Sequence, residues 1–297
     1  MTGLLWPIIG VGLLGLLGLA GATMVWRRRM ALAFEARDRA RRPLDVQGVV
    51  VGAEDIRLAG TNGRAVLVLH GFNDTPQSMA YLSAQLHGAG YTVHALRLAG
   101  HGCALPEFAR EARADRWRTQ VLAAFDALAA SGQPVYVCGQ SMGAALSVLL
   151  AAERDVRALA LLAPFIGLDP WQGWQFRLAA LSPAPYFQSR GGERSFVDQE
   201  ARRAALGPGV VTARALLALR EVALAAEAAL SRVEEPTLYI QSRLDNRVSV
   251  AFGERHFKAI TGSDKRQIWL ERCAHIISAD VEKDVVAAAV VEWFDGH

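Results

Sequence analysis

A serine between two glycines lies where an apolar strand pattern gives way to a helical one. Residues 135–150 read VYVCGQSMGAALSVLL, which places Ser141 in a G-x-S-x-G sequence. Between a strand and a helix, this sequence forms a sharp turn that lifts the serine hydroxyl above the edge of a sheet. Small residues at Gly143 and Ala144 let the helix approach the strand, and the strained turn costs ~1 to 3 kcal/mol. The pattern predicts that Ser141 is a nucleophile; a simple serine N-cap is the alternative.

A serine nucleophile needs a base that takes its proton and an acid that orients the base. The acid is expected just after a later strand. Residues 237–241 form a strand pattern, and Asp245 follows in the loop 242–247. Asp264 and Glu271 are weaker candidates, because Glu271 lies at a strand end and too near the candidate base in the sequence. Asp245 is therefore the predicted acid.

Three of the seven histidines follow Asp245 in the chain. His256 falls within a helical pattern and His297 ends the chain, which leaves His275, in the loop after the next strand pattern. A single histidine is more often structural than catalytic. The order Ser141, Asp245, His275, each after a strand, nevertheless favours one site at a common edge of the sheet.

The tetrahedral oxyanion formed during acyl transfer needs preorganised N–H donors. One donor is expected from Met142, the residue after the nucleophile. The other is expected from the loop after the first continuous apolar strand, where residues 69–74 read LHGFND. There the N–H of Phe72 is the natural donor, Gly71 permits close backbone approach, and His70 is expected to brace the loop by hydrogen bonding.

These residues need a scaffold, and the chain supplies alternating strand and helix patterns. At 297 residues and 52% hydrophobic composition it suits one large α/β domain, at 46–297. Extended or strand patterns occupy 46–51, 55–59, 65–69, 92–96, 135–138, 158–162, 237–241 and 267–270. Helical patterns occupy 78–88, 115–130, 142–152, 250–260 and 281–294. Such alternation predicts a mainly parallel sheet with helices on both faces.

About 70 residues separate two neighbouring strand patterns, where an α/β connection usually has ~2 to 6. We therefore expect a helical cap inserted at about 165–235. Aromatic residues gather in its first half, where they are expected to form the cap's own core, line an acyl pocket or touch a membrane surface: Trp171, Trp174, Phe176, Tyr186 and Phe187. The helical pattern 212–230 has a wide apolar face that needs cover from the main domain or from lipid.

The N-terminal segment Leu4 to Trp26 has no charged residue. As a helix it would be about 34 Å long, enough to cross a bilayer. The basic block that follows predicts a single-pass membrane anchor at 4–26 with the catalytic domain on the cytoplasmic side. A basic juxtamembrane linker or helix would occupy 27–45. The alternative is an exported protein whose signal peptide is cleaved after the small residues at 20–22.

The remaining composition excludes several classes. Residues 27–42 hold seven arginines against two acidic residues, a net +5, and since the chain carries +3 the rest sums to −2. Because the rest of the chain is nearly neutral, its composition does not indicate a nucleic-acid-binding protein. Three widely spaced cysteines match neither a disulfide framework nor a zinc pattern. The cysteines therefore predict no metal site, and the oligomeric state is left open.

Five of these features together resemble the α/β-hydrolase fold over about residues 45–297, within it the carboxylesterase and monoacylglycerol lipase-like serine hydrolases with a small cap. They are LHGF at 69–72, LAGHG at 98–102, GQSMG at 139–143, Asp245, and HIISAD at 275–280. One departure is Ala144, where many such enzymes have a second glycine.

The resemblance implies a cofactor-free hydrolase that cleaves short- to medium-chain carboxylic esters or monoacylglycerols through an acyl-enzyme. The alternatives are thioesterase, amidase or peptidase, or acyltransferase chemistry on the same three residues, or a non-catalytic binding protein. Dehalogenase chemistry is disfavoured, because it would need a carboxylate in place of Ser141.

Overall fold

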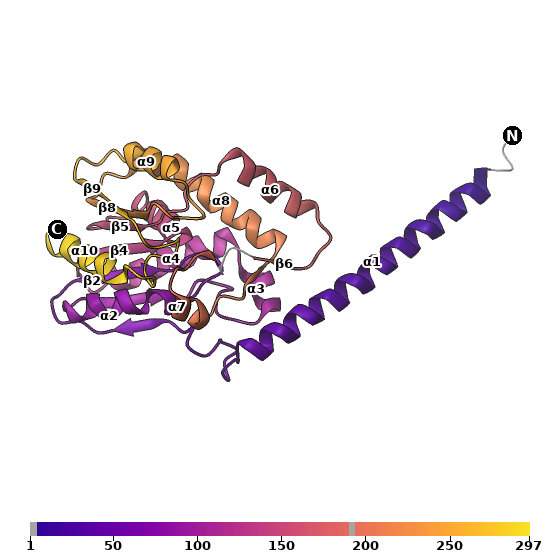
Figure 1. Cartoon of the computed structure of the whole chain (residues 1–297), viewed down its shortest axis with the longest axis horizontal. Coiled ribbons are helices and arrows are strands. Elements are labelled where there is room, and N and C mark those ends of the chain that lie inside the picture. Colours follow the sequence, from indigo (N-terminus) through magenta and orange to yellow (C-terminus); the bar gives the residue numbers. More distant parts are fainter. Residues whose placement is uncertain (1–4, 190–193) are drawn as a thin grey trace.

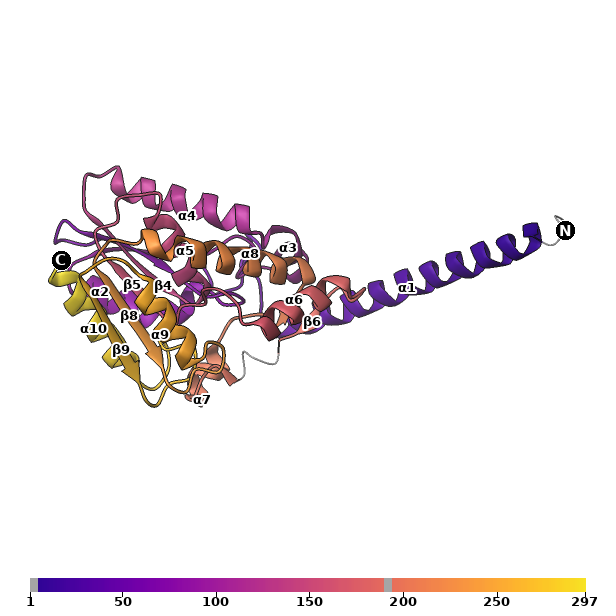
Figure 2. The ribbon, with the colours of Figure 1, turned by 90° about the horizontal axis from the view of Figure 1, so that it is seen from above.

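A seven-stranded sheet forms the centre of the molecule (Figures 1 and 2), with strand order β1-β3-β2-β4-β5-β8-β9. The computed structural model describes residues 5–189 and 194–297, with side chains from residue 15 on. The strands are β1 (Ile56–Leu58), β2 (Ala65–Leu69), β3 (Thr92–Leu96), β4 (Val135–Gln140), β5 (Leu159–Leu162), β8 (Thr237–Ser242) and β9 (Lys265–Leu270). β1 runs antiparallel to β3 and the other neighbours pair in parallel. The predicted mainly parallel sheet is confirmed.

Both faces of the sheet are buried, which explains the continuous apolar runs of its central strands. In β2, Val66 and Val68 belong to one hydrophobic core, and Leu67 and Leu69 belong to the core on the opposite face. The first core includes α2 (Ala80–Gly88) and α10 (Lys283–Asp295). The second includes α4 (Ala114–Ala129), α5 (Met142–Ala151) and α8 (Ala213–Ala229). α9 (Val250–Ala259) adjoins β8.

Two short segments differ from the expected pattern. The extended run expected at 46–51 forms turns and isolated bridges. Gly48 within it and Gly52 just after it have φ of 80° and 87°, which a straight strand does not allow. A short helix that the hydrophobic pattern had not indicated, α3 (Leu105–Glu111), follows β3. Its local signals are a proline in the first turn and the acidic residue Glu107.

The segment between β5 and β8 contains α6 (Pro170–Leu181), β6 (Phe187–Gln188), α7 (Gln199–Ala204), β7 (Val210–Val211) and α8. β6 and β7 pair as a small antiparallel ribbon. α8 packs on α5, and its buried face joins the main core. The wide apolar face expected at 212–230 is therefore covered by the main domain. Among the described elements of this segment, α6, β6, α7 and β7 lie outside the sheet and the helices that cover it.

The aromatic residues of this segment do not form one core. Trp171 and Trp174 stack on α6 with ring centroids 5.3 Å apart, and both are largely exposed. Tyr186 is buried, with its ring 5.9 Å from that of Phe34. Phe176 lines a cavity described below.

The N-terminal helix α1 (Leu5–Arg41) projects from the body of the molecule, and its C-terminal part lies against it (Figures 1 and 2). Arg42, just after the helix, forms a buried ion pair with Asp38 and donates to the carbonyls of Leu206 and Cys103. Nearer the N-terminus of α1, Arg27 donates to the carbonyl of Pro183. Most of the expected linker at 27–45 is thus a docked helix.

Within the described residues, no helix combines the length and the apolar character needed to cross a membrane. The predicted span at 4–26 lies partly outside those residues, since the description of side chains begins at residue 15.

Candidate active site

The turn between β4 and α5 has the strained geometry that the sequence predicts. Ser141 has φ 56° and ψ −114°, a left-handed conformation that costs a non-glycine residue energy. Its N–H donates to the carbonyl of Leu162 on the neighbouring strand β5, at 2.8 Å. A Cβ atom added at Gly139 would lie 2.4 Å from the backbone of Gly143. Glycine at both positions is what lets strand and helix meet this closely.

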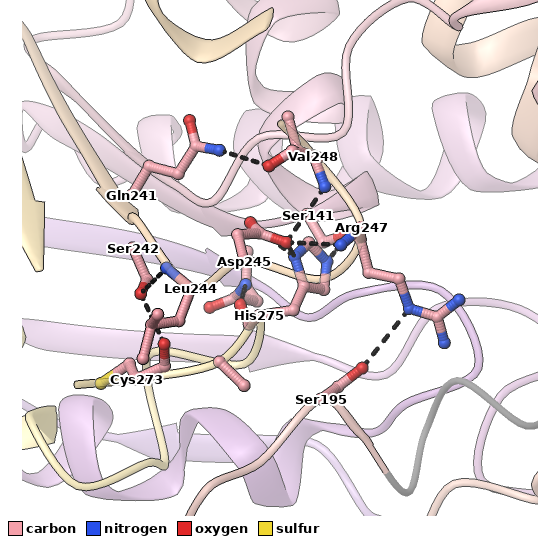
Figure 3. Close-up of polar contacts among 12 residues, drawn as sticks. Ser141, Ser195, Gln241, Ser242, Leu244, Asp245, Arg247, Val248, Cys273 and His275 are labelled. Atoms are coloured by element: carbon pink, nitrogen blue, oxygen red, sulfur yellow. Dashed lines mark hydrogen bonds and ion pairs between the residues drawn. The ribbon is translucent and has the colours of Figure 1, made fainter. Parts of the chain in front are cut away.

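The three side chains predicted to act together are in hydrogen-bond contact (Figure 3). The Nε2 atom of His275 lies 2.8 Å from the Oγ of Ser141. The Nδ1 atom lies 2.9 Å from each carboxylate oxygen of Asp245. The imidazole and the carboxylate are 8% and 1% exposed, so this contact is shielded from water. The ring is positioned to take a proton from the hydroxyl while the carboxylate holds its other nitrogen.

The carboxylate of Asp245 is itself held by the loop after β8. Its Oδ1 accepts the backbone N–H groups of Arg247 at 2.8 Å and Val248 at 3.0 Å. The two weaker candidates are engaged elsewhere, because Glu271 pairs with Arg243 and Asp264 contacts His297.

The loop that carries His275 is fixed by two polar residues whose roles the sequence analysis missed. The amide of Gln140 donates to the carbonyl of His275 at 2.9 Å. Asp280, fully buried, accepts the N–H of Ala274 and also the N–H groups of Val197 and Asp198, just before α7. Asp280 therefore ties the histidine loop to the cap. The sequence signal that could have indicated the role of Asp280 was an acidic residue at the end of HIISAD, five residues after His275.

The two predicted oxyanion donors lie on either side of Ser141. Met142 is the first residue of α5, a position at which a helix leaves its N–H groups without an intrahelical acceptor. On the facing loop, a Cβ added at Gly71 would lie only 3.4 Å from the Cβ of Ser141, and Phe72 follows. In the described part of the chain, the Phe72 N–H donates no backbone hydrogen bond. Phe72 and Met142 therefore remain the candidate donors.

His70 braces the facing loop, as the sequence analysis expected. The N–H of Leu98 donates to its Nε2 at 3.1 Å, so Nδ1 carries the ring proton and donates to the carbonyl of Gly71 at 2.8 Å. Burial lowers the pKa of His70 to about 4, so the ring is neutral at neutral pH. It holds the loop in place through these two hydrogen bonds.

A cavity of about 510 Å³ opens at Ser141 and His275. Part of its wall is apolar, supplied by Phe72, Phe165, Phe176, Val211, Leu219 and Ile276. An elongated apolar group bound there would lie against carbon atoms, with its reactive end near the serine hydroxyl. Asp74 also lines the cavity, and burial raises its pKa to about 6 against the lowering effect of hydrogen bonds from Ser78 and Thr75.

Comparison with known protein families gives a match to the Hydrolase_4 family (serine aminopeptidase, S33) over residues 60–282. The matched range contains Phe72, Ser141, Asp245 and His275, and it begins after α1. A carboxylesterase of Bacillus subtilis (strain 168) is 24% identical, over 78% of this chain and 92% of its own. A thermostable monoacylglycerol lipase of Bacillus sp. (strain H-257) is 27% identical, over 84% of this chain and 97% of its own.

Solved structures show the same fold. A structure from work on the metagenome-derived lipolytic enzymes LipS and LipT is 28% identical, covers 84% of this chain and 100% of its own, and has a TM-score of 0.77. A monoacylglycerol lipase of Paleococcus ferrophilus, 17% identical, covers 80% of this chain and 96% of its own, with a TM-score of 0.68. The second likeness concerns the fold alone. The architecture is the α/β-hydrolase fold.

Proposed function

Because the chain belongs to the Hydrolase_4 family and is a serine hydrolase of the esterase and monoacylglycerol lipase type, we propose that it cleaves short- to medium-chain carboxylic esters or monoacylglycerol-like lipids. The observation that carries this proposal is the unbroken hydrogen-bonded series from Ser141 through His275 to Asp245, at a cavity with a partly apolar wall.

The proposed reaction has two steps. The Oγ of Ser141 attacks the ester carbonyl while Nε2 of His275 takes its proton, and Asp245 stabilises the imidazolium that forms. The N–H groups of Phe72 and Met142 bind the oxyanion. On collapse, the imidazolium protonates the leaving alcohol and an acyl-enzyme remains. Water, deprotonated by the same imidazole, then attacks the acyl carbonyl and releases the carboxylic acid, and the proton returns to Ser141.

An acyl-length series tests the proposal. We expect p-nitrophenyl esters and monoacylglycerols to be hydrolysed, with kcat/KM highest for short or medium acyl chains, because a cavity of about 510 Å³ holds only a limited chain. Thioester and anilide substrates of the same acyl group serve as matched controls. Faster cleavage of the thioester or the anilide would replace the esterase assignment by a thioesterase or an amidase.

We further propose that residues 4–26 anchor the protein in a membrane, with the catalytic domain on the cytoplasmic side. The uncharged sequence and the three arginines at 27–29 support this. So does an exposed apolar stripe on α6, formed by Trp171, Trp174, Leu178 and Leu181. The chain just after this stripe contacts Arg27 through the carbonyl of Pro183, which sets the stripe beside the basic residues.

Fractionation tests the anchor. We expect the full chain to remain in the membrane pellet after carbonate extraction, and a variant with Leu16→Arg and Leu19→Arg to be released, because each buried charge opposes insertion by ~3 kcal/mol. The matched control replaces two exposed leucines outside the span, Leu32 and Leu244, by arginine. Two results would contradict the anchor. One is recovery of the full chain in the supernatant, and the other is a measured protein mass that corresponds to a chain starting at Thr23.

A further inference from the structure

The cavity at Ser141 is built partly by the N-terminal helix. Arg37 and Arg41 of α1 line it, together with Arg202 of α7 and with Arg247, which follows the acid of the catalytic site. Four guanidinium groups therefore surround the space that an ester must enter. The residues of α1 lie before the family match, which begins at residue 60.

The acidic residues at the same cavity are already engaged. Asp38 faces Arg42, whose Nε and Nη2 atoms donate to its two carboxylate oxygens at 2.8 Å and 2.7 Å, with both side chains buried. Asp74 accepts hydrogen bonds from Ser78 and Thr75. The positive charge of the four lining arginines is thus only weakly offset, and the cavity attracts anions.

Two of the four guanidinium groups are free to bind a ligand. Over the described ranges 5–189 and 194–297, the side chains of Arg37 and Arg202 make no hydrogen bond or ion pair, and both are exposed. The other two guanidinium groups already donate hydrogen bonds. Arg41 donates to the carbonyl of Gly207. Arg247 donates to the Oγ of Ser195 (Figure 3). A guanidinium presents five N–H donors in a planar fork that matches a phosphate or carboxylate.

We propose that the preferred substrate is an ester that also carries an anionic group, a phosphate or a carboxylate, which Arg37 and Arg202 bind at the mouth of the cavity. The acyl chain then lies against the apolar wall, with its carbonyl at Ser141. This inference rests on the proposed ester hydrolysis and adds a class of substrate to it. It also makes α1 a part of the substrate site.

Matched substrate pairs in neutral detergent test the inference on the full chain. One pair is 1-hexanoylglycerol and 1-hexanoylglycerol 3-phosphate; the other is phenyl hexanoate and 4-carboxyphenyl hexanoate, so that in both pairs the anion is on the alcohol part and the acyl chain is the same. We expect kcat/KM of the parent to favour the anionic member of at least one pair. The preference should fall about 10-fold in Arg37→Gln/Arg202→Gln and should weaken with rising salt.

The control is Arg39→Gln/Arg203→Gln, which removes the same charge from the same two helices at exposed positions outside the cavity lining. It should keep the parental preference. A preference in the phosphate pair identifies a phosphate ligand, and one in the 4-carboxyphenyl pair identifies a carboxylate ligand.

Three results would overturn the inference. The first is no anionic preference in either pair, with the neutral esters still hydrolysed. The second is a preference that Arg37→Gln/Arg202→Gln leaves intact. The third is an effect of that variant only on binding to vesicles containing phosphatidylglycerol, which would assign these arginines to the bilayer surface. If no ester is hydrolysed at all, the proposed function itself is wrong.

Discussion

Ser141→Ala is expected to lower kcat for any ester by about 10⁶-fold, the size of loss seen when a serine nucleophile is removed from such a site. The hydroxyl that His275 activates, 2.8 Å away, is then absent, and no acyl-enzyme can form. KM should change little, because the cavity wall and the oxyanion donors remain. Steady-state kinetics with a p-nitrophenyl ester measure the loss, and labelling by a fluorophosphonate should disappear.

Ser147→Ala is the matched control for this prediction. Ser147 lies on α5, the helix that follows Ser141. It is also buried, and its hydroxyl donates only to the backbone carbonyl of Gly143. Its replacement should preserve both turnover and labelling. If Ser141→Ala retained more than about a hundredth of the parental kcat, the assignment of the nucleophile would be wrong.

Gly143→Ala is expected to lower the free energy of unfolding by ~3 kcal/mol, an effect at the upper end for overpacking. A Cβ at this position would lie 2.2 Å from the carbonyl oxygen of Leu69 and 2.7 Å from that of His70. Both atoms are backbone at the end of β2, so no side chain can move aside. α5 and the loop that carries Phe72 would have to separate. Urea unfolding of the two proteins measures the difference.

Gly173→Ala provides the opposite case in the same experiment. Gly173 lies inside α6, and a Cβ added there meets no atom within 4 Å. Alanine should therefore stabilise by ~0.5 to 1 kcal/mol through its higher helix propensity. Equal stability of Gly143→Ala and the parent would mean that α5 is less closely packed on β2 than these distances require.

Much of the fold follows from local patterns. The alternation of strands and helices, the resemblance to α/β-hydrolases and the glycines around Ser141 are all features of short windows of sequence, and the comparisons confirm the family. The order Ser141, Asp245, His275 adds long-range information, because parallel strands place their carboxyl ends at one edge of a sheet. The structure brings those three residues together, and their catalytic roles await the measurements above.

Other features depend on contacts between distant segments. The basic stretch after residue 26 was expected to be a linker or a helix, because its charges indicate only a position beside a membrane. Its docking depends on the buried pair of Asp38 and Arg42 and on backbone carbonyls more than 60 residues away, which no local window contains. The cover of α8 was left open for a similar reason, since its apolar face alone does not reveal that α5 and the main core cover it.

The course of α1 has a consequence for how the enzyme is oriented. The helix continues without a break from Leu5 to Arg41, and its last turns form part of the wall around the reactive serine. A domain on a flexible tether rotates freely and samples all directions. Here one continuous helix joins the two ends, so the direction of its N-terminal half is fixed relative to the entrance of the cavity.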